Sequence, residues 1–440
     1  MLPTKFNISP KKKKAIRNIA WAVCGKIVNL ASVLVVGIIV ARYLGKEQYG
    51  VMNYVISFVA IFQVFADFGL DFIQIREESK LPAERNKIIG TTFAIKLMAA
   101  TATLIAIAAV TCTMVAEAQL RLYIGIYACS ILLNTTWVTR NHFTAIVWNE
   151  YVVKTEISRN IIGLVVKFAL VMLHLPLVWF IGALLFDSFL LATGYVFSYS
   201  KKIGQVRAWS FDVQLARYMV RQSFPLLLSG AAIIVYNRID QLLIDSMIDH
   251  SHLGLYSVAV KFTETLFFIP TIISQTLHPM LVEIRQQDLL RYEQTSQTFI
   301  SVTVYLCIAM AVITSLLSYP IVYFTFGKTY IGAASVLSVL AFKVIGDGLS
   351  QTSGQLIIIE GKQKYVVVRN ILGCIACILL NLWLINRYGI HGAAYTALVT
   401  IGISGTLANA LIPPYQAIFH KQMKALFTGW RDIAHIKQLL

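Results

Sequence analysis

Charged side chains recur inside the apolar segments of this 440-residue chain, where an ionised group is costly. Insertion scales put the cost of a central Lys, Arg or Asp at about 2.5–3.5 kcal/mol, so such residues usually face a cavity or a partner. The basic members are Lys26, Lys96, Lys167, Arg238, Lys261 and Lys343. The acidic members are Asp67, Asp187, Asp240, Glu264 and Asp347. Side chains of this kind bind ionic cargo or carry a coupling ion, so they indicate a transporter with a solvated interior.

The sign of these charges favours an anionic cargo. Bases slightly outnumber acids when Asp71 is counted as interfacial, and ammonium and guanidinium groups bind phosphate and pyrophosphate well. We therefore predict that the bases line a substrate-binding cavity. The acids are candidates for binding a coupling proton or sodium ion, Asp67, Asp187 and Asp347 foremost. An equally good interpretation is that these acids neutralise the lysines.

Two pairs of these charges have helical spacing. Lys261 and Glu264 are three residues apart, and Lys343 and Asp347 are four residues apart, so each pair shares a helix face. An ion pair within the helix is as good an interpretation for each as a place in the cavity. The other bases have no acid at this spacing, although a side chain near a span end, such as Lys26, can snorkel to the interface.

The sequence contains none of the motifs that carry the commoner enzymatic chemistries. It has no H-E-x-x-H, P-loop or G-x-S-x-G motif, and no His/Cys cluster with metal-ligand spacing. Cys374 and Cys377 form a C-x-x-C, but like the other cysteines they lie in an apolar segment, and we interpret them as packing residues. We predict no enzymatic activity, no catalytic residues, no metal site and no cofactor other than a coupling ion, H⁺ or Na⁺.

The elements that carry the charges are membrane spans. Hydrophobic residues make up 57% of the chain and charged residues only 13%, and the mean hydropathy is +0.69. So little charge cannot cover a soluble protein of this length. The net charge of +17 is spread over short loops rather than along one face, which argues against nucleic acid as a partner. The first apolar stretch lacks a small-residue cleavage site and is predicted to be a retained span.

About twelve apolar segments are long enough to cross a bilayer. They lie near residues 19–41, 50–72, 89–113, 121–139, 157–173, 177–199, 223–244, 254–276, 298–318, 333–358, 365–386 and 391–413. The loops between them are short and leave no room for a soluble domain. This predicts an all-α polytopic membrane protein solvated by the lipid bilayer.

The loop charges predict the orientation. With the N-terminus in the cytoplasm, most of the 38 basic residues fall in cytoplasmic segments. The exterior loops then hold only Arg42, Lys46, Arg121, Lys328 and Arg387. Because Lys and Arg accumulate on the cytoplasmic side of membrane proteins, we predict that both termini are cytoplasmic.

The chain repeats itself at a spacing that matches its topology. Arg159-Asn160-Ile161-Ile162-Gly163 recurs 210 residues later as Arg369-Asn370-Ile371-Leu372-Gly373, and Gly50 recurs 204 residues later as Gly254. Six spans per repeat give two halves of the same orientation, related by an axis along the membrane normal. We expect two six-helix lobes around a central cavity. The predicted boundaries are an N-terminal lobe at 1–200, a basic cytoplasmic linker at 201–222, a C-terminal lobe at 223–414 and a cytoplasmic tail at 415–440.

Short motifs occur in order along nearly the whole chain. They are ARYLGKEQYG at 41–50, DFGLD at 67–71 followed by Arg76, Asp240 with GLYSVA at 254–259 and Pro279, FGKTY at 326–330 with Ala333, and YGIHGAA at 388–394. Together they resemble the motifs of bacterial polysaccharide-export flippases, the Wzx-like branch of the MOP superfamily. Each motif is degenerate alone, but their order and the matching topology make the resemblance specific.

The resemblance implies a flippase that moves an undecaprenyl-pyrophosphate-linked oligosaccharide from the cytoplasmic to the periplasmic leaflet of the bacterial inner membrane. Such proteins alternate between inward and outward openings and serve the biosynthesis of O-antigen, lipopolysaccharide and related glycans. A polysaccharide polymerase and a chain-length regulator are the implied protein partners. Arg42 and Arg76 match family motifs, but both lie at span ends, where loop packing is at least as good an interpretation as substrate contact.

Three alternatives stay open. A lipid II flippase of the same superfamily normally carries about two more spans than are counted here. A MATE-type multidrug/cation antiporter shares the fold, but a cavity dominated by acids would suit it better. The third alternative is a membrane scaffold or a membrane enzyme. A scaffold would not need so many buried charges, and the absence of catalytic motifs disfavours an enzyme.

Overall fold

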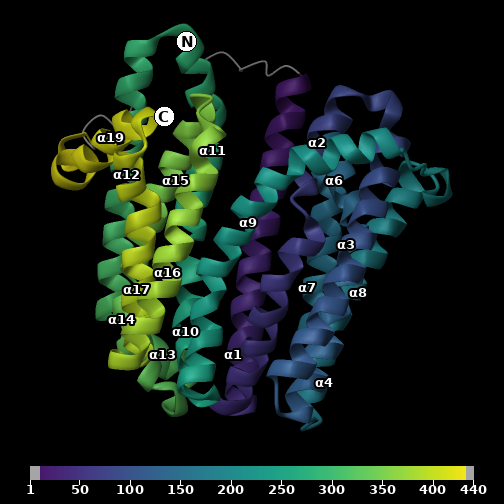
Figure 1. The fold of residues 1–440 in the computed structure, drawn as a ribbon. Coiled ribbons are helices and arrows are strands. Elements are labelled where there is room, and N and C mark those ends of the chain that lie inside the picture. The colour runs from purple at the N-terminus through teal and green to yellow at the C-terminus, as the bar shows by residue number, and fades with distance from the viewer. Residues whose placement is uncertain (1–9, 433–440) are drawn as a thin grey trace, which may run out of the picture. The chain divides into compact units, whose positions relative to one another are not determined.

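The computed structural model describes the backbone of residues 10–432 and the side chains of residues 34–432. All regular secondary structure in this part of the chain is helical, and it contains no strand (Figure 1). It has ten helical segments long and apolar enough to cross a membrane. The chain is therefore a polytopic membrane protein, and the predicted all-α class is confirmed.

The predicted count of about twelve spans is not confirmed. The span predicted at 19–41 falls mostly on residues whose side chains are not described. The span predicted at 157–173 falls on α7, Asn149–Met172, which is not among the ten. Five charged residues lie in the sequence of α7, namely Glu150, Lys154, Glu156, Arg159 and Lys167.

Two compact units make up the chain. The first comprises residues up to Ile39 and Phe62–Leu227, and the second comprises Val40–Ile61 and the residues from Leu228 onward. Helices α1 (Pro10–Asp67) and α9 (Val213–Met247) contribute to both units. The lobe boundaries predicted from the sequence repeat remain a proposal.

The first unit is built around α3. Its helices are α2 (Leu70–Lys80), α3 (Arg85–Met114), α4 (Ala118–Ala128), α5 (Ser130–Asn134), α6 (Val138–Ala145), α7 and α8 (Leu177–Lys202). Ile89, Val138, Phe143 and Tyr195 belong to one buried cluster that joins α3, α6 and α8. Burial of these large side chains fixes the helices that carry the charged residues described below.

A capping carboxylate ties the start of α9 to α3. Asp212 accepts the Leu215 backbone N–H at 2.7 Å and pairs with Lys87 at 2.9 Å. These contacts, the N–H first, hold the pKa of the Asp212 carboxyl below its usual range. The contacts therefore stabilise the folded chain above that range and are lost as the pH falls through the lowered pKa.

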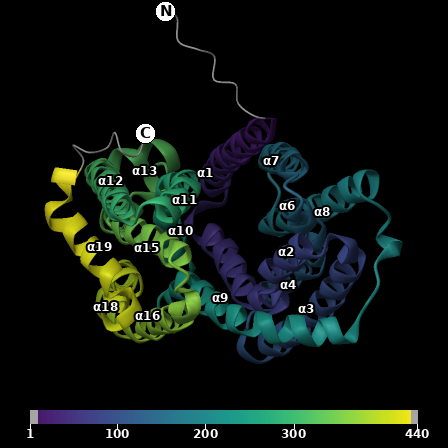
Figure 2. The same cartoon turned by 90° about the horizontal axis from the view of Figure 1, so that it is seen from above.

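The second unit contains the remaining helices. They are α10 (His250–Leu266), α11 (Phe268–Gln287), α12 (Leu289–Leu316), α13 (Ser318–Phe326), α14 (Gly332–Leu340), α15 (Lys343–Ile359), α16 (Val366–Tyr388), α17 (Ile390–Gly402), a π-helical turn at Ile403–Leu407, α18 (Ala408–Leu411) and α19 (Gln416–Thr428). Figure 2 shows α12, α15, α16, α18 and α19 grouped within this unit. Phe299, Leu356 and Tyr415 are part of its buried core.

The 41–50 motif makes close backbone contacts within the second unit. Gly45 breaks α1 with a φ of 71°, a conformation that glycine adopts without strain. After the break, a Cβ on Gly50 would overlap the carbonyl of His250, and a Cβ on Gly254 would overlap the carbonyl of Lys46. Lys46 and His250 have the same 204-residue offset as the two glycines. The contact is thus reciprocal, since each glycine lies against backbone that precedes the other glycine by four residues.

Arg42 also belongs to this packing. Its Nε and Nη2 donate to the carbonyls of Thr325 and Phe324, each at 2.6 Å, and these are terminal carbonyls of α13 that lack a helical partner. Tyr330 donates to the carbonyl of Ala41 at 2.8 Å. The family-motif arginine therefore joins α1 to α13, which supports the loop-packing interpretation over substrate contact.

We expect Gly50→Ala and Gly254→Ala each to destabilise the protein by about 1–3 kcal/mol, because the added methyl group meets backbone that cannot rotate away. Thermal unfolding of the purified protein measures the loss. Gly182→Ala is the matched control, since a Cβ there meets nothing within 4 Å. Equal melting temperatures for all three variants would contradict the proposed contact.

Candidate functional site

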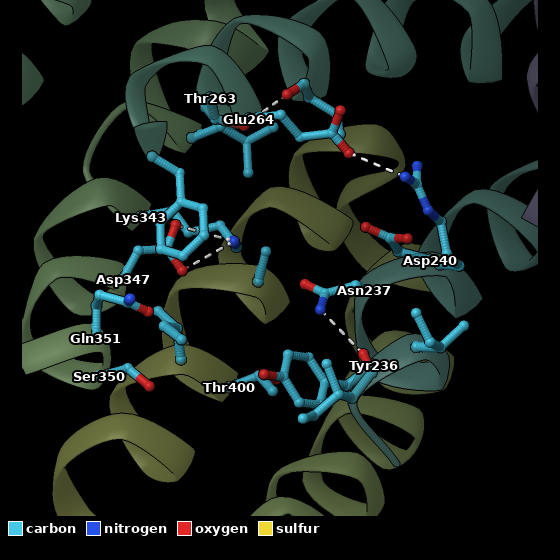
Figure 3. Close-up of a pocket in the computed structure, with 18 of the residues that line it drawn as sticks. Tyr236, Asn237, Asp240, Thr263, Glu264, Lys343, Asp347, Ser350, Gln351 and Thr400 are labelled. Atoms are coloured by element: carbon cyan, nitrogen blue, oxygen red, sulfur yellow. Dashed lines mark hydrogen bonds and ion pairs between the residues drawn. The ribbon is translucent and has the colours of Figure 1, made fainter. Parts of the chain in front are cut away.

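A cavity of about 460 Å³ lies within the second unit and is lined by charged and hydrogen-bonding side chains. Helix α9 contributes Tyr236 and Asp240, and α10 contributes Tyr256 and Glu264. Helix α15 contributes Lys343, Asp347 and Gln351, and α16 and α17 contribute Arg369 and Thr400. Figure 3 shows Lys343 and Asp347 on one side of the space and Asp240 on the other.

The cavity brings together several residues that the sequence singled out. Arg238, Asp240, Glu264, Lys343 and Asp347 all line it, although they come from three helices. Its described lining holds three bases and three acids, the third base being Arg369. The basic excess predicted for the whole set is therefore absent from this cavity.

Two ion pairs account for four of the six charges. Lys343 Nζ lies 3.1 Å from both carboxylate oxygens of Asp347, one helical turn away, as the spacing allowed. Glu264, considered above as a partner for Lys261, forms an ion pair across helices, in which Arg238 Nη2 lies 3.1 Å from Glu264 Oε1. Packing of α9 beside α10 makes this contact, which residue spacing within one helix could not indicate.

Asp240 is held by hydrogen bonds rather than by a base. Tyr256 donates its hydroxyl to Asp240 at 2.5 Å, and the backbone N–H of Gln241 donates at 2.8 Å. Gln241 in turn accepts from Ser57 at 2.7 Å. Asp240 is buried, so these donors offset the desolvation of its charge.

Arg369 and Asn370 are the functional candidates that the sequence reasoning missed. The orientation count placed Arg369 among the cytoplasmic basic residues rather than among the buried charges, but it lies in α16, is 8% exposed and lines the cavity. Asn370 donates to Ser229 at 2.7 Å. The recurrence of Arg-Asn at 159–160 and 369–370 was the signal that could have identified them.

The first unit holds a second, separate charge cluster. Lys96 is 1% exposed, and its Nζ lies 2.5 Å from Asp71 and 3.4 Å from Asp67. Asn141 also donates to Asp71, at 2.7 Å. Lys96 has no partner by helical spacing within its own helix, but it has two acid partners from elsewhere in the chain. One of them is Asp71, which was counted above as interfacial.

Hydrogen bonds continue from this cluster toward α6. Asn141 reaches Gln74 at 3.1 Å, and Gln74 reaches Glu78 at 2.7 Å. Glu78 contacts His142 Nδ1 at 2.5 Å. A chain of polar groups therefore runs through the interior of this unit.

Lys167 and Asp187 form a third site by pairing between α7 and α8. Gly163 leaves room for the pair, since a Cβ there would collide with the Asp187 carboxylate. Arg76, in the second half of α2, contacts its neighbour Glu77 at 2.8 Å and Tyr218 of α9 at 3.3 Å. Lys26 lies outside the residues whose side chains are described.

Charge pairing characterises these three sites. Among the described residues, no group of three or more His, Cys, Asp or Glu side chains could hold a metal ion. The cavity of the second unit differs from the other two sites because it combines paired charges, free volume and one base without an acid partner. It is the arrangement best suited to bind a charged molecule.

Comparisons with known proteins agree on the type of fold. The model of a family described as "Polysaccharide biosynthesis protein" matches residues 15–285. The lipid II flippase MurJ in an inward closed conformation has a similar structure, with a TM-score of 0.70 and 13% identity over 96% of this chain and 95% of that chain. An outward-facing multidrug resistance MATE family transporter of the MOP superfamily gives a TM-score of 0.64 and 12% identity over 99% of this chain and 100% of that one. No curated protein sequence matches this chain at a significant level.

Proposed function

Because this chain belongs to the polysaccharide biosynthesis protein family, we propose that it flips a polyprenyl-pyrophosphate-linked oligosaccharide from the cytoplasmic to the periplasmic leaflet of a bacterial inner membrane. The observation that carries the proposal is the charged cavity of the second unit, formed by membrane helices of a MOP-type fold. Arg238 and Lys343 would contact the anionic head group there. The sugars would pass through water, and the polyprenyl chain would stay in lipid.

The other bases take different roles in this proposal. Lys96 and Lys167 are each neutralised by acids within the first unit, so we assign them to holding the unit in one conformation during transport by alternating access. Lys26 and Lys261 remain candidates for substrate contact. The orientation, with both termini cytoplasmic, the two six-helix lobes and association with a polymerase and a chain-length regulator belong to the same proposal.

Flipping can be measured directly. Purified protein is reconstituted in vesicles that contain a lipid-linked oligosaccharide in both leaflets, and a membrane-impermeant glycan-cleaving enzyme is added outside. We expect cleavage to proceed from half to nearly all of the substrate with this protein and to stop at half in protein-free vesicles. Cleavage that stops at half with folded protein would end the proposal.

Coupling to an ion gradient is a separate part of the proposal. The candidate carboxylates are Asp67, Asp187, Asp240, Glu264 and Asp347, and intramembrane acids commonly bind H⁺ or Na⁺. An imposed pH or sodium gradient across the vesicles is then expected to change the flipping rate. A rate indifferent to both gradients would remove coupling and leave the flippase proposal intact.

A MATE-type cation antiporter or a lipid II flippase is the second candidate. The equal numbers of acids and bases in the cavity favour the antiporter more than a purely basic cavity would. Both alternatives are tested in the same vesicles, by extrusion of a cationic dye and by flipping of lipid II. Dye extrusion without glycan-lipid flipping would assign the antiporter function.

A further inference from the structure

Arg369 is a buried base whose charge is not matched. It is 8% exposed, and two guanidinium nitrogens, Nε and Nη1, are buried without a hydrogen-bond partner. No ion pair to Arg369 is found among the described residues. A buried guanidinium without a partner is strongly destabilising, and such groups are retained where a ligand completes them.

The acids of the same cavity do not complete Arg369. Glu264 pairs with Arg238, Asp347 pairs with Lys343, and Asp240 is held by Tyr256 and the Gln241 backbone. The remaining neighbours on α15 and α16 are neutral hydrogen-bonding groups, including Gln351 and Asn370. Each acid therefore has its own hydrogen-bond or ion-pair partner, and no described carboxylate lies within ion-pair distance of Arg369.

We infer that Arg369 binds one phosphate oxyanion of the cargo inside this cavity. A guanidinium presents parallel N–H donors that match two oxygens of a phosphate, which a lysine cannot do. The cavity of about 460 Å³ has room for a diphosphate group. The inference rests on the proposed function, and it names the side chain that distinguishes a diphosphate lipid from a neutral one.

Stability provides the first test. If Arg369 is kept for binding at the expense of stability, replacing it with an apolar side chain should stabilise the fold. Arg369→Met is therefore expected to raise the melting temperature of the ligand-free protein by at least about 2 °C. A fall in melting temperature would show that Arg369 is instead a structural residue and would overturn the inference.

Ligand binding provides the second test. Native mass spectrometry of the full-length protein in detergent would measure affinity for a polyprenyl diphosphate, a polyprenyl monophosphate, inorganic pyrophosphate and a neutral polyprenol. We expect Arg369→Gln to weaken binding of the polyprenyl diphosphate and of inorganic pyrophosphate at least tenfold, and to leave binding of the polyprenol unchanged. Arg369→Lys is expected to recover only part of the loss. Arg291→Gln, at an exposed position of α12 outside the cavity, is the control and should bind as the wild type does.

The outcomes separate this inference from the proposed function. Equal diphosphate affinity in wild type and Arg369→Gln would overturn the role of Arg369, even if the protein flips glycan lipids. Arg369-dependent binding of inorganic pyrophosphate, in a protein that flips no glycan lipid, would support the anion site and end the flippase proposal. Affinity for neutral polyprenol that falls with the diphosphates would indicate general damage to the cavity and would also overturn the role of Arg369.

Discussion

Replacing Lys96 by methionine is expected to destabilise the first unit by about 3–5 kcal/mol, because the change leaves Asp67 and Asp71 without their common cation. Methionine preserves most of the side-chain volume, so the loss measures charge rather than a cavity. We expect a lower melting temperature of the purified protein and a reduced amount in the membrane. Lys80→Met is the matched control, because the Lys80 side chain is 60% exposed and its Nζ lies as far as 4.0 Å from Glu77 Oε1, a weak ion pair.

A compensating change separates the two roles considered for Lys96. In Lys96→Met/Asp71→Asn, one of the two carboxylates that Lys96 neutralises is itself made neutral, and most of the lost stability should return. If Lys96 only neutralises its neighbours, glycan-lipid flipping should return with the protein level. A stable double variant that does not flip would reassign Lys96 to cargo or to the coupling ion.

The sequence was sufficient to locate the buried charges but not to pair them. Lys96 and Asp71 are 25 residues apart on different helices, and no spacing rule within one helix connects them. Lys343 and Asp347 were recognised as a possible pair because both lie on α15. Contacts between helices depend on helix rotation and tilt, which hydropathy does not determine.

Arg369 shows a second limit of sequence reasoning. Its position beside Lys362 and Lys364 made it appear to be a loop charge that marks the cytoplasmic side. The structure starts α16 at Val366, so Arg369 falls in the first turn of that helix and faces inward. Arg369 was counted with the cytoplasmic charges although it lies inside the predicted span at 365–386, and a cavity residue was thus left out of the candidate set. The repeated Arg-Asn pair was the better guide, since polar residues that recur inside apolar segments need a structural or functional reason.

The family motif at 41–50 was predicted correctly as a motif, and its physical role became clear only from contacts. Gly45 supplies a backbone conformation, Arg42 satisfies carbonyls of α13, and Gly50 allows a close backbone crossing. Each of these partners lies about 200 or more residues away in the chain. The residues of this motif thus act in packing, and none of them lines the cavity of the second unit.

Loss of the Lys343 ammonium is expected to reduce glycan-lipid flipping at least tenfold. Lys343→Ala removes a cation from the cavity and leaves Asp347, which is 7% exposed, without its partner. Charge-assisted hydrogen bonds of this kind contribute about 1.5–3 kcal/mol, and a tenfold change corresponds to about 1.4 kcal/mol. The vesicle assay measures the rate, and Lys364→Ala, at an exposed position outside the cavity, is the control.

Exchanging the two charges distinguishes neutralisation from substrate contact. Lys343→Asp/Asp347→Lys keeps an ion pair four residues apart but moves the ammonium by about 6 Å along α15. The exchange also places the acid N-terminal to the base, the order that the helix dipole favours. We therefore expect the exchanged protein to recover its melting temperature and membrane level while flipping stays low. If flipping recovers fully, the pair serves only to neutralise charge, and cargo recognition in this cavity must lie with the remaining bases, Arg238 and Arg369.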